Sequence, residues 1–373
     1  MKRIFIILTV VFILILLTIT ALAEDNKTLY EQQYNSSGLE ETENLLPKEV
    51  TQGLDSLGVD ISDPQSLGNI DIKNVFKIVW EFLSTGAKKP LKIITAILGL
   101  ILIFAAGEGL VTETPGSAFY MIICFGATLI MLEPAFEMVK GVEVAVKGIT
   151  TFMLTFVPVY GGIMASSGLV SSAGGFSSLL LLATEVLAQF VSFGFVPIMG
   201  GFLCLGIGGG ISPIAGVSKI AEFIKKSANW LMGIVTSVFV GVLAVQTSLQ
   251  SAADTLGIRT SKAVLSGSIP IMGPAIAETL SAAKQCLGIL RSGAGIYGAL
   301  AVILIVAPIA CELLIWRLGL WLCAGVAEVF SLNQAATLVR SVDFCFAILI
   351  GALTFVALLF IISLTIISSS GGG

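Results

Sequence analysis

The sequence predicts an all-α, polytopic membrane protein with about six to eight transmembrane helices. Of its 373 residues, 56% are hydrophobic and only 12% are charged, whereas soluble domains carry about 25% charged residues. The apolar residues form blocks long enough to cross a bilayer, which takes about 20 helical residues. Most of these blocks are apolar on every face, unlike the amphipathic helices of a soluble protein. We therefore expect lipid to be the solvent of most of the chain.

Residues 1–23 have the three parts of a secretory signal peptide. Lys2 and Arg3 form a basic start, residues 4–20 are strongly apolar, and residues 21–23 (ALA) fit a signal peptidase site. The apolar run is slightly long for this role, so an uncleaved anchor is the alternative. In either case, the chain from Glu24 onward is expected to begin on the extracytoplasmic side of the membrane.

Residues 24–87 form an acidic extracytoplasmic segment. Twelve acidic residues stand against four lysines between positions 24 and 86. Many turn-forming residues lie in its first part, which we expect to be partly disordered or a short helical domain that needs a partner. Residues 71–84 alternate apolar and charged side chains at helical spacing. This pattern predicts a helix in the membrane interface, with Trp80 at headgroup depth.

The rest of the chain, residues 88–373, is the predicted helical membrane domain. A shorter candidate span, interrupted by Pro270, Gly273 and Pro274, covers 264–283. Two topology rules disagree here: the signal peptide places Glu24 outside, but counting spans from there places most lysines outside too, against the positive-inside rule. The topology of the later loops stays open. The main candidate spans are 91–106, 118–132, 149–166, 178–207, 229–246, 296–324 and 344–367.

Weak internal similarity suggests a duplication, with repeats at 145–250 and 257–362. Pro158 and Pro270 stand in similar contexts, and so do Pro197 and Pro308 at nearly the same offset. Repeats with an odd number of crossings are inverted in the membrane, an arrangement that builds transporters around a site of broken helices. Chance similarity among common membrane-protein residues is the alternative.

Proline and glycine free backbone groups that lipid cannot satisfy, so broken backbone must face protein or a water-filled cavity. Those in or beside the apolar segments are the candidates for a transport pathway or gate. Close helix packing explains most of the remaining glycines. The candidates are Pro158, Gly161, Pro197, Gly200, Pro270, Gly273 and Pro274.

Charged residues at membrane depth are costly and are functional candidates for that reason. Glu185 lies one or two turns into the predicted span 178–207, and Glu278 follows the second broken segment. Glu312 and Arg317 share one predicted span, and their long side chains could meet there. Arg340 and Asp343 could pair at the end of the last span. The alternative is that these residues form structural pairs or extend their charges to the membrane surface.

The residue types present argue against an enzyme. Histidine, the commonest general base and metal ligand, is absent. The six cysteines fall in or beside apolar segments, where they act as small buried hydrophobes. Residues 293–298 match a dinucleotide fingerprint as a string, but no strand precedes them. The sequence therefore predicts no catalytic residue, no metal site, no cofactor and no nucleic-acid partner.

Three stretches of the membrane domain carry a resemblance to a known family. They are 156–162 (FVPVYGG), 209–214 (GGISPI) leading to 228–231 (ANWL), and 271–274 (IMGP) followed by 292–295 (SGAG). Taken whole, the chain resembles the stage III sporulation protein AE family of endospore-forming Firmicutes. The similarity covers nearly the full length and rests on general likeness, because the family has no catalytic signature to transfer.

The resemblance implies a place in the assembly that links mother cell and forespore during sporulation. It implies a protein in the mother-cell membrane that surrounds the forespore, acting with other stage III sporulation proteins of the same operon. Across the intermembrane space, the implied partner is stage II sporulation protein Q. The expected function is a non-enzymatic component of a channel or secretion-like complex, and a homo-oligomer is compatible with it. The alternative is a stand-alone secondary transporter of a small solute.

Overall fold

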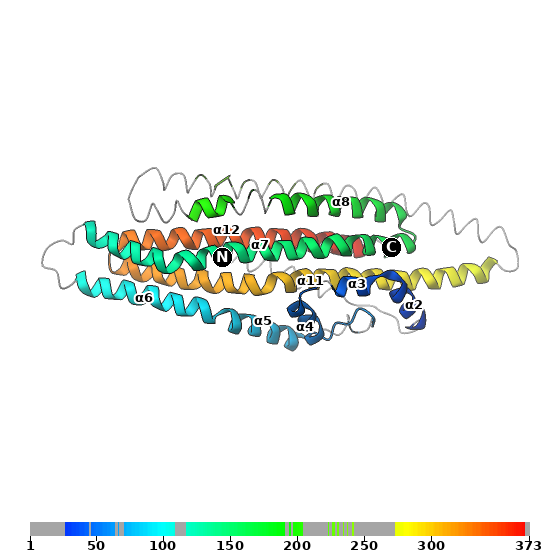
Figure 1. Cartoon of the computed structure of the whole chain (residues 1–373). Helices are drawn as coiled ribbons and strands as arrows, with labels where there is room; N and C mark the ends of the chain where they lie inside the picture. The colour runs from blue at the N-terminus through cyan, green and yellow to red at the C-terminus, as the bar shows by residue number, and fades with distance from the viewer. Residues whose placement is uncertain are drawn as a thin grey trace.

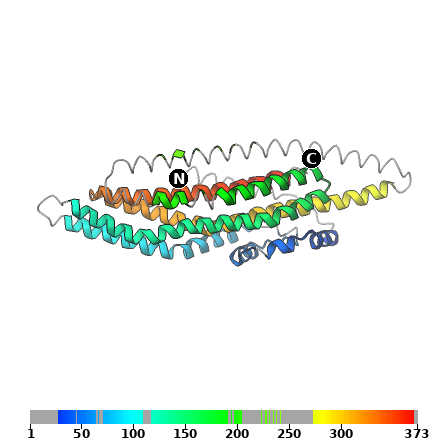
Figure 2. The same ribbon diagram turned by 45° about the horizontal axis from the view of Figure 1, so that its top comes forward.

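The computed structural model describes residues 27–44, 46–63, 66, 71–108, 117–190, 194, 197–203, 223, 226, 227, 230, 234, 237, 241 and 273–369. Within these ranges the chain forms helices that run along one axis of an elongated bundle (Figures 1 and 2). No strand occurs among the described residues, which confirms the all-α prediction. The predicted signal peptide, residues 1–23, lies outside the described residues.

The described helices fall into a group of short ones near the N-terminus and a group that forms the bundle. Three short helices come first: α2 (Lys27–Ser37), α3 (Leu39–Glu43) and α4 (Lys48–Ser56). The bundle itself contains α5 (Ile72–Gly86), α6 (Lys88–Glu108), α7 (Ser117–Ser166), α8 (Val170–Gln189), α11 (Gly273–Val329) and α12 (Asn333–Ser369).

Two of these helices are far longer than a bilayer is thick. Helix α7 has 50 residues and α11 has 57, so at 1.5 Å per residue they measure about 75 and 85 Å. The hydrocarbon core of a bilayer is only about 30 Å thick. The predicted spans 118–132 and 149–166 are therefore parts of one continuous helix, and 273–283 continues directly into 296–324 within α11.

The described residues contain four helical stretches long and apolar enough to cross a membrane. The predicted count of six to eight is not reached within them. The candidate 229–246 falls largely outside the described residues, and the candidate 178–207 is helical only to Gln189 and again at 197–203. The four stretches are Lys88–Gly107, Met121–Ser166, Leu287–Val329 and Asn333–Leu364.

Helices α11 and α12 form an antiparallel hairpin, the most extensive helix pair in the structure. Ser331 turns the chain with a φ of 60°, and the Leu332 backbone N–H donates to the Ala327 carbonyl at 2.9 Å. Trp316 of α11 meets Phe346 of α12 edge to face, with ring centroids 5.9 Å apart. Between residues 341 and 364, α12 has no exposed side chain. Protein neighbours therefore cover this apolar helix.

Helices α6 and α7 form a second antiparallel hairpin beside the first. A Cβ at Gly126 of α7 would lie 3.3 Å from the Leu100 side chain of α6. On the other side of α6, a Cβ at Gly319 of α11 would overlap the Ile94 side chain. Glycine allows these helices to approach closely, as small residues do in membrane bundles.

The chain passes from α7 to α8 through a turn that the proposed repeat does not reproduce. Gly168 has a φ of 91°, and the Leu169 backbone N–H donates to the Met164 carbonyl at 3.1 Å, the six-residue bond of a Schellman motif. At the repeat offset the matching position falls inside α11, which is continuous there. The predicted duplication is therefore not confirmed.

The acidic segment is helical and packs on the bundle. Leu39 and Leu54 are buried, and a Cβ at Gly53 of α4 would lie 3.1 Å from the Leu304 side chain of α11. Helix α3 contacts α7. We call residues 27–63 the acidic module. Helix α5, predicted from residues 71–84, starts at the N-cap Asp71, whose carboxylate accepts from the Lys73 backbone N–H at 2.9 Å.

Candidate functional site

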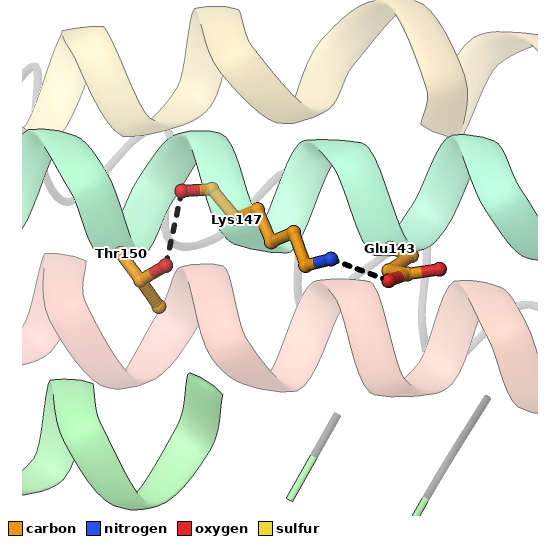
Figure 3. Close-up of polar contacts among 3 residues, drawn as sticks. All are labelled: Glu143, Lys147 and Thr150. Carbon is orange, nitrogen blue, oxygen red and sulfur yellow. Dashed lines mark hydrogen bonds and ion pairs between the residues drawn. The ribbon is translucent and has the colours of Figure 1, made fainter. Parts of the chain in front are cut away.

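Charged side chains ring the bundle near the middle of α7, where α6 begins. Lys89 of α6 forms an ion pair with Glu137 of α7. About two to three turns further along α7, Lys147 Nζ lies 2.6 Å from Glu143 Oε1, and the Thr150 hydroxyl donates to the Lys147 carbonyl at 3.0 Å (Figure 3). We call this set the charged girdle; it comprises Lys88, Lys89, Lys92, Glu133, Glu137, Lys140, Glu143 and Lys147.

Glu312 of α11 lies at the level of the girdle. A Cβ at Gly86, at the end of α5, would lie 3.7 Å from Glu312 Cβ. The half-buried Glu312 carboxylate interacts electrostatically with Lys89 and Glu137. Three helices thus bring charges together where α5 ends and α6 begins.

The ion pairs of the α11–α12 hairpin differ from those that the sequence predicts. Arg317 Nε donates to Asp343 Oδ1 at 3.1 Å, and these side chains are 15% and 24% exposed. Glu312 and Arg317, five residues apart, point about 140° away from each other around α11. Arg340 pairs with Glu328 at 2.6 Å rather than with Asp343. The predicted partners of Arg317 and Arg340 are therefore wrong, because the hairpin register supplies closer ones.

Pro158 does not break its helix. Helix α7 continues through Pro134 and Pro158, although each proline removes one backbone hydrogen bond. Around it, the rings of Phe152, Phe156 and Tyr160 stack in sequence at 5.1 and 5.5 Å. This packing holds the helix on both sides of Pro158, so the break predicted there is wrong.

Gly161 serves a close helix approach. A Cβ at Gly161 would overlap the Ser177 hydroxyl of α8, so glycine lets α7 and α8 touch. Tyr160 meets Phe176 of α8 edge to face at 5.7 Å. Close helix packing, the alternative explanation for glycines in the apolar segments, therefore accounts for Gly161.

The other predicted pathway residues are scattered. Pro197 and Gly200 lie in a short helical stretch, 197–203, where a Cβ at Gly200 would lie 3.8 Å from Phe136 Cε1. Gly273 and Pro274 stand in the first turn of α11, a position that proline tolerates. Pro270 falls outside the described residues.

The remaining predicted carboxylates are also apart from Glu312. Glu185 is exposed on α8 and accepts a hydrogen bond from the Gln189 amide at 2.9 Å. Glu278 lies in the first part of α11. The described residues therefore do not assemble the predicted prolines, glycines and carboxylates into one site.

Sequence reasoning missed a buried polar cluster under the acidic module. Arg291 of α11 is 4% exposed, and its guanidinium interacts electrostatically with the buried Tyr160 hydroxyl of α7. The Tyr297 hydroxyl of α11 interacts with Glu43, Tyr34 and Asp55 of the module. An arginine inside an apolar run was the available signal.

Two groups of the module, the Tyr34 phenol and the Glu43 carboxyl, have raised pKa values. Burial raises the pKa of Tyr34 to about 12, with further contributions from Glu43, Asp60 and Glu40. Burial also raises the pKa of Glu43, and the nearby carboxylates of Asp60, Asp55 and Glu40 add to this effect. Both shifts follow from docking an acidic segment against an apolar surface.

The described residues bring no three histidine, cysteine, aspartate or glutamate side chains together as a metal site. Three of the ion pairs among the described residues join different helices: Lys89–Glu137, Arg317–Asp343 and Arg340–Glu328. Such pairs hold neighbouring helices in register.

Comparisons with known proteins identify the family. The family model for stage III sporulation protein AE matches residues 65–371. Stage III sporulation protein AE of Bacillus subtilis (strain 168) is 22% identical over 259 residues, which cover 69% of this chain and 65% of the length of that relative. No solved structure matches. The family match extends from α5 through α12, so the chain belongs to the stage III sporulation protein AE family.

Proposed function

We propose that the protein is a non-enzymatic, multi-pass membrane component of the channel or secretion-like complex between mother cell and forespore. It acts in stage III of sporulation, after engulfment, from the mother-cell membrane that surrounds the forespore. Its partners are the other stage III sporulation proteins of the same operon and, across the intermembrane space, stage II sporulation protein Q. The observation that carries the proposal is the family match over residues 65–371.

The geometry of the charged groups supports a structural role. Arg317 pairs with Asp343, and Arg340 pairs with Glu328, both across the α11–α12 hairpin. Lys89 pairs with Glu137 across the α6–α7 hairpin. Each pair joins two helices, which suits a component that holds a fixed shape in a larger assembly.

Deletion of the gene in the native spore-former tests the proposal. We expect engulfment to proceed, late forespore gene expression to stop and heat-resistant spores to be lost, and a plasmid copy should restore all three. Affinity capture from sporulating cells should then recover the operon partners and stage II sporulation protein Q. Normal sporulation in the deletion strain would contradict the proposal.

A stand-alone secondary transporter is the second candidate, favoured by the half-buried Arg317–Asp343 pair at membrane depth. Neutralising Glu312 or Asp343, as Glu312→Gln and Asp343→Asn, separates the two candidates. A transporter would lose solute uptake while its associations stayed intact. A scaffold would keep sporulation wherever the variant is still captured with its partners. Glu143→Gln, on the exposed face of α7, is the matched control.

A further inference from the structure

Exposed large apolar side chains are numerous at one end of the bundle, and smaller groups lie elsewhere, among them Phe76, Val79 and Trp80 of α5. On α7, five of them fall within residues 121–132, and only Val144 and Leu154 follow in the rest of that helix. On α11, no side chain between 287 and 313 is exposed, but large apolar ones are exposed from Leu314 onward. We call the following set the apolar belt: Leu91, Leu102, Ile103, Met121, Ile122, Phe125, Leu129, Leu132, Leu314, Leu318, Trp321, Leu322 and Val329.

The side chains of the belt lie on three neighbouring helices, α6, α7 and α11, at the same level along the axis of the bundle. Lys89 pairs with Glu137 at one limit of the belt, and Glu312 lies at the same level. From that level, α6 and α11 run toward the end of the bundle at which α7 and α12 begin (Figures 1 and 2). The belt therefore has the charged girdle as its boundary on the side facing the middle of the molecule.

The height of the belt matches the thickness of a bilayer. From Lys89 to its end at Glu108, α6 is about 28 Å long at 1.5 Å per residue, close to the roughly 30 Å of a hydrocarbon core. Only 22% of the apolar window of α6 is buried inside the protein. The Arg340–Glu328 pair lies near the turn of the α11–α12 hairpin, at the opposite limit of the belt from the charged girdle. Charges thus flank the belt on both sides, as headgroups require.

The opposite half of the bundle carries a surface that hydrocarbon would exclude. There the acidic module covers α7 and α11, with Gly38 beside Val159 and Gly53 beside Leu304. The outer face of the module exposes Glu40, Glu41, Glu49 and Asp55. Four exposed carboxylates in a bilayer core would each be costly. Helix α12 has no exposed side chain between residues 341 and 364 and is buried by protein in both halves.

We infer that the bilayer surrounds only the belt half of the bundle, and that the other half projects from the membrane with the acidic module docked on it. The belt half comprises α6, α7 up to Glu137, α11 from Glu312 and the first part of α12. The stretch 149–166, which hydropathy alone predicts to be a span, then lies outside the lipid. This inference is independent of the proposed role in sporulation.

Helix α8 provides the strictest test of this assignment. It packs along the projecting half of α7 and still exposes Val170, Leu182 and Val186. These three residues form a smaller apolar surface without a charged girdle among its described neighbours. Under the inference they face water, whereas a bilayer that reached the projecting half would cover them.

Single cysteines at exposed positions of the full-length chain distinguish these arrangements. Leu129→Cys lies in the belt, Thr151→Cys lies on the projecting half of the same helix, and Leu182→Cys lies on α8. Each is introduced into a chain whose six native cysteines, at positions 124, 204, 286, 311, 323 and 345, are replaced by alanine, because Cys311 is only partly buried. Each variant is reconstituted in liposomes of phosphatidylethanolamine and phosphatidylglycerol, and freeze–thawing admits a water-soluble maleimide to both sides.

Because the thiolate is the reactive species and hydrocarbon suppresses ionisation, Leu129→Cys should react at least about tenfold more slowly than the other two variants. Labelling in denaturant confirms that each thiol is present. A nitroxide at each position, probed with oxygen and with a polar nickel complex, reports lipid exposure independently of reactivity. Equal protection of Thr151→Cys and Leu129→Cys would overturn the inference. Rapid labelling of Leu129→Cys, or protection of Leu182→Cys, would overturn it as well.

Discussion

The belt half and the projecting half of the bundle are built from the same helices, yet they cover their apolar side chains differently. In the belt half, α6, α7 and α11 turn large apolar side chains outward. In the projecting half, the acidic module and α8 cover α7 and α11, whereas α12 is enclosed in both halves. An apolar helix can therefore be covered either by lipid or by other parts of the protein, and its amino-acid composition is similar in the two cases.

A lysine placed in each half should give the largest difference between them. Leu129 and Leu154 are exposed leucines of α7, one in the belt and one in the projecting half. Lysine at the centre of a lipid-facing helix costs roughly 2.5–3.5 kcal/mol, so Leu129→Lys should lower membrane-inserted protein and thermal stability in liposomes. Leu154→Lys, facing water, should change either quantity by no more than about 0.5 kcal/mol.

Equal losses from these two substitutions would show that both halves of α7 are in lipid. A loss for Leu154→Lys alone would show that the bilayer surrounds the projecting half instead of the belt half. The quantity of each variant in washed membranes and its unfolding temperature, measured side by side, decide between these results.

The ion pair of the belt half should rank next. Removing one partner of a fully buried pair costs about 3–5 kcal/mol, and Arg317 and Asp343 keep some exposure. We therefore expect Arg317→Met to cost about 2 kcal/mol in thermal unfolding of the reconstituted protein. The double variant Arg317→Met/Asp343→Leu should recover most of that loss, because it leaves no uncompensated charge. Additive losses would show that the pair contributes nothing through its contact.

Two glycines of α11, one packed against α6 and one with open space around it, give a third comparison. A leucine at Gly319 would collide with Ile94, whereas Gly325 has no heavy atom within 4 Å of its Cβ position. Overpacking costs about 1–3 kcal/mol, so Gly319→Leu should lower the unfolding temperature while Gly325→Leu leaves it nearly unchanged. Similar behaviour of both variants would mean that α6 does not pack on α11 at this level.

The sequence predicted the helical class and the position of α6 and α5, because these depend on local periodicity and end signals. It did not predict that 118–132 and 149–166 belong to one helix. Charged residues between them, from Glu133 to Lys147, resemble a polar loop when only composition is considered. In the structure, Lys89 of another helix and Lys147 one turn away satisfy two of those carboxylates.

Site prediction was limited for a related reason. The sequence shows which charged residues lie in apolar segments, but their partners depend on helix register, which no local pattern encodes. Arg317 therefore pairs with Asp343 of the facing helix rather than with Glu312 of its own. The sequence predicts a break at Pro158 because it does not reveal tertiary packing. In the structure, neighbours such as Phe156 and Tyr160 support the helix around this proline.

Docking of the acidic module in the projecting half should depend on pH. The pKa of Glu43 in the folded protein lies above its ordinary value of 4.5, so the docked module favours the protonated carboxyl. The resulting stabilisation is fully present below the ordinary pKa and is lost as pH rises through the raised pKa. Hydrogen exchange in residues 27–63, corrected for its intrinsic pH dependence, should therefore increase over that interval.

Substitution isolates the contribution of this carboxyl group. Glu43→Gln should remove most of the pH dependence of module docking, since glutamine stays neutral. Glu49→Gln, on the exposed face of α4, is the control and should retain it. An unchanged pH profile in Glu43→Gln would show that this carboxyl group does not cause the effect.

The smallest effect should come from the pair at the water-facing side of the girdle. Glu143 and Lys147 are one turn apart on α7, with 24% and 55% of their side chains exposed (Figure 3). Exposed pairs at this spacing contribute only about 0.3–0.5 kcal/mol, so Lys147→Met should barely shift the unfolding temperature, and salt should erase the shift. A loss near that of Arg317→Met would mean that hydrocarbon reaches Lys147, moving the boundary between the two halves beyond the girdle.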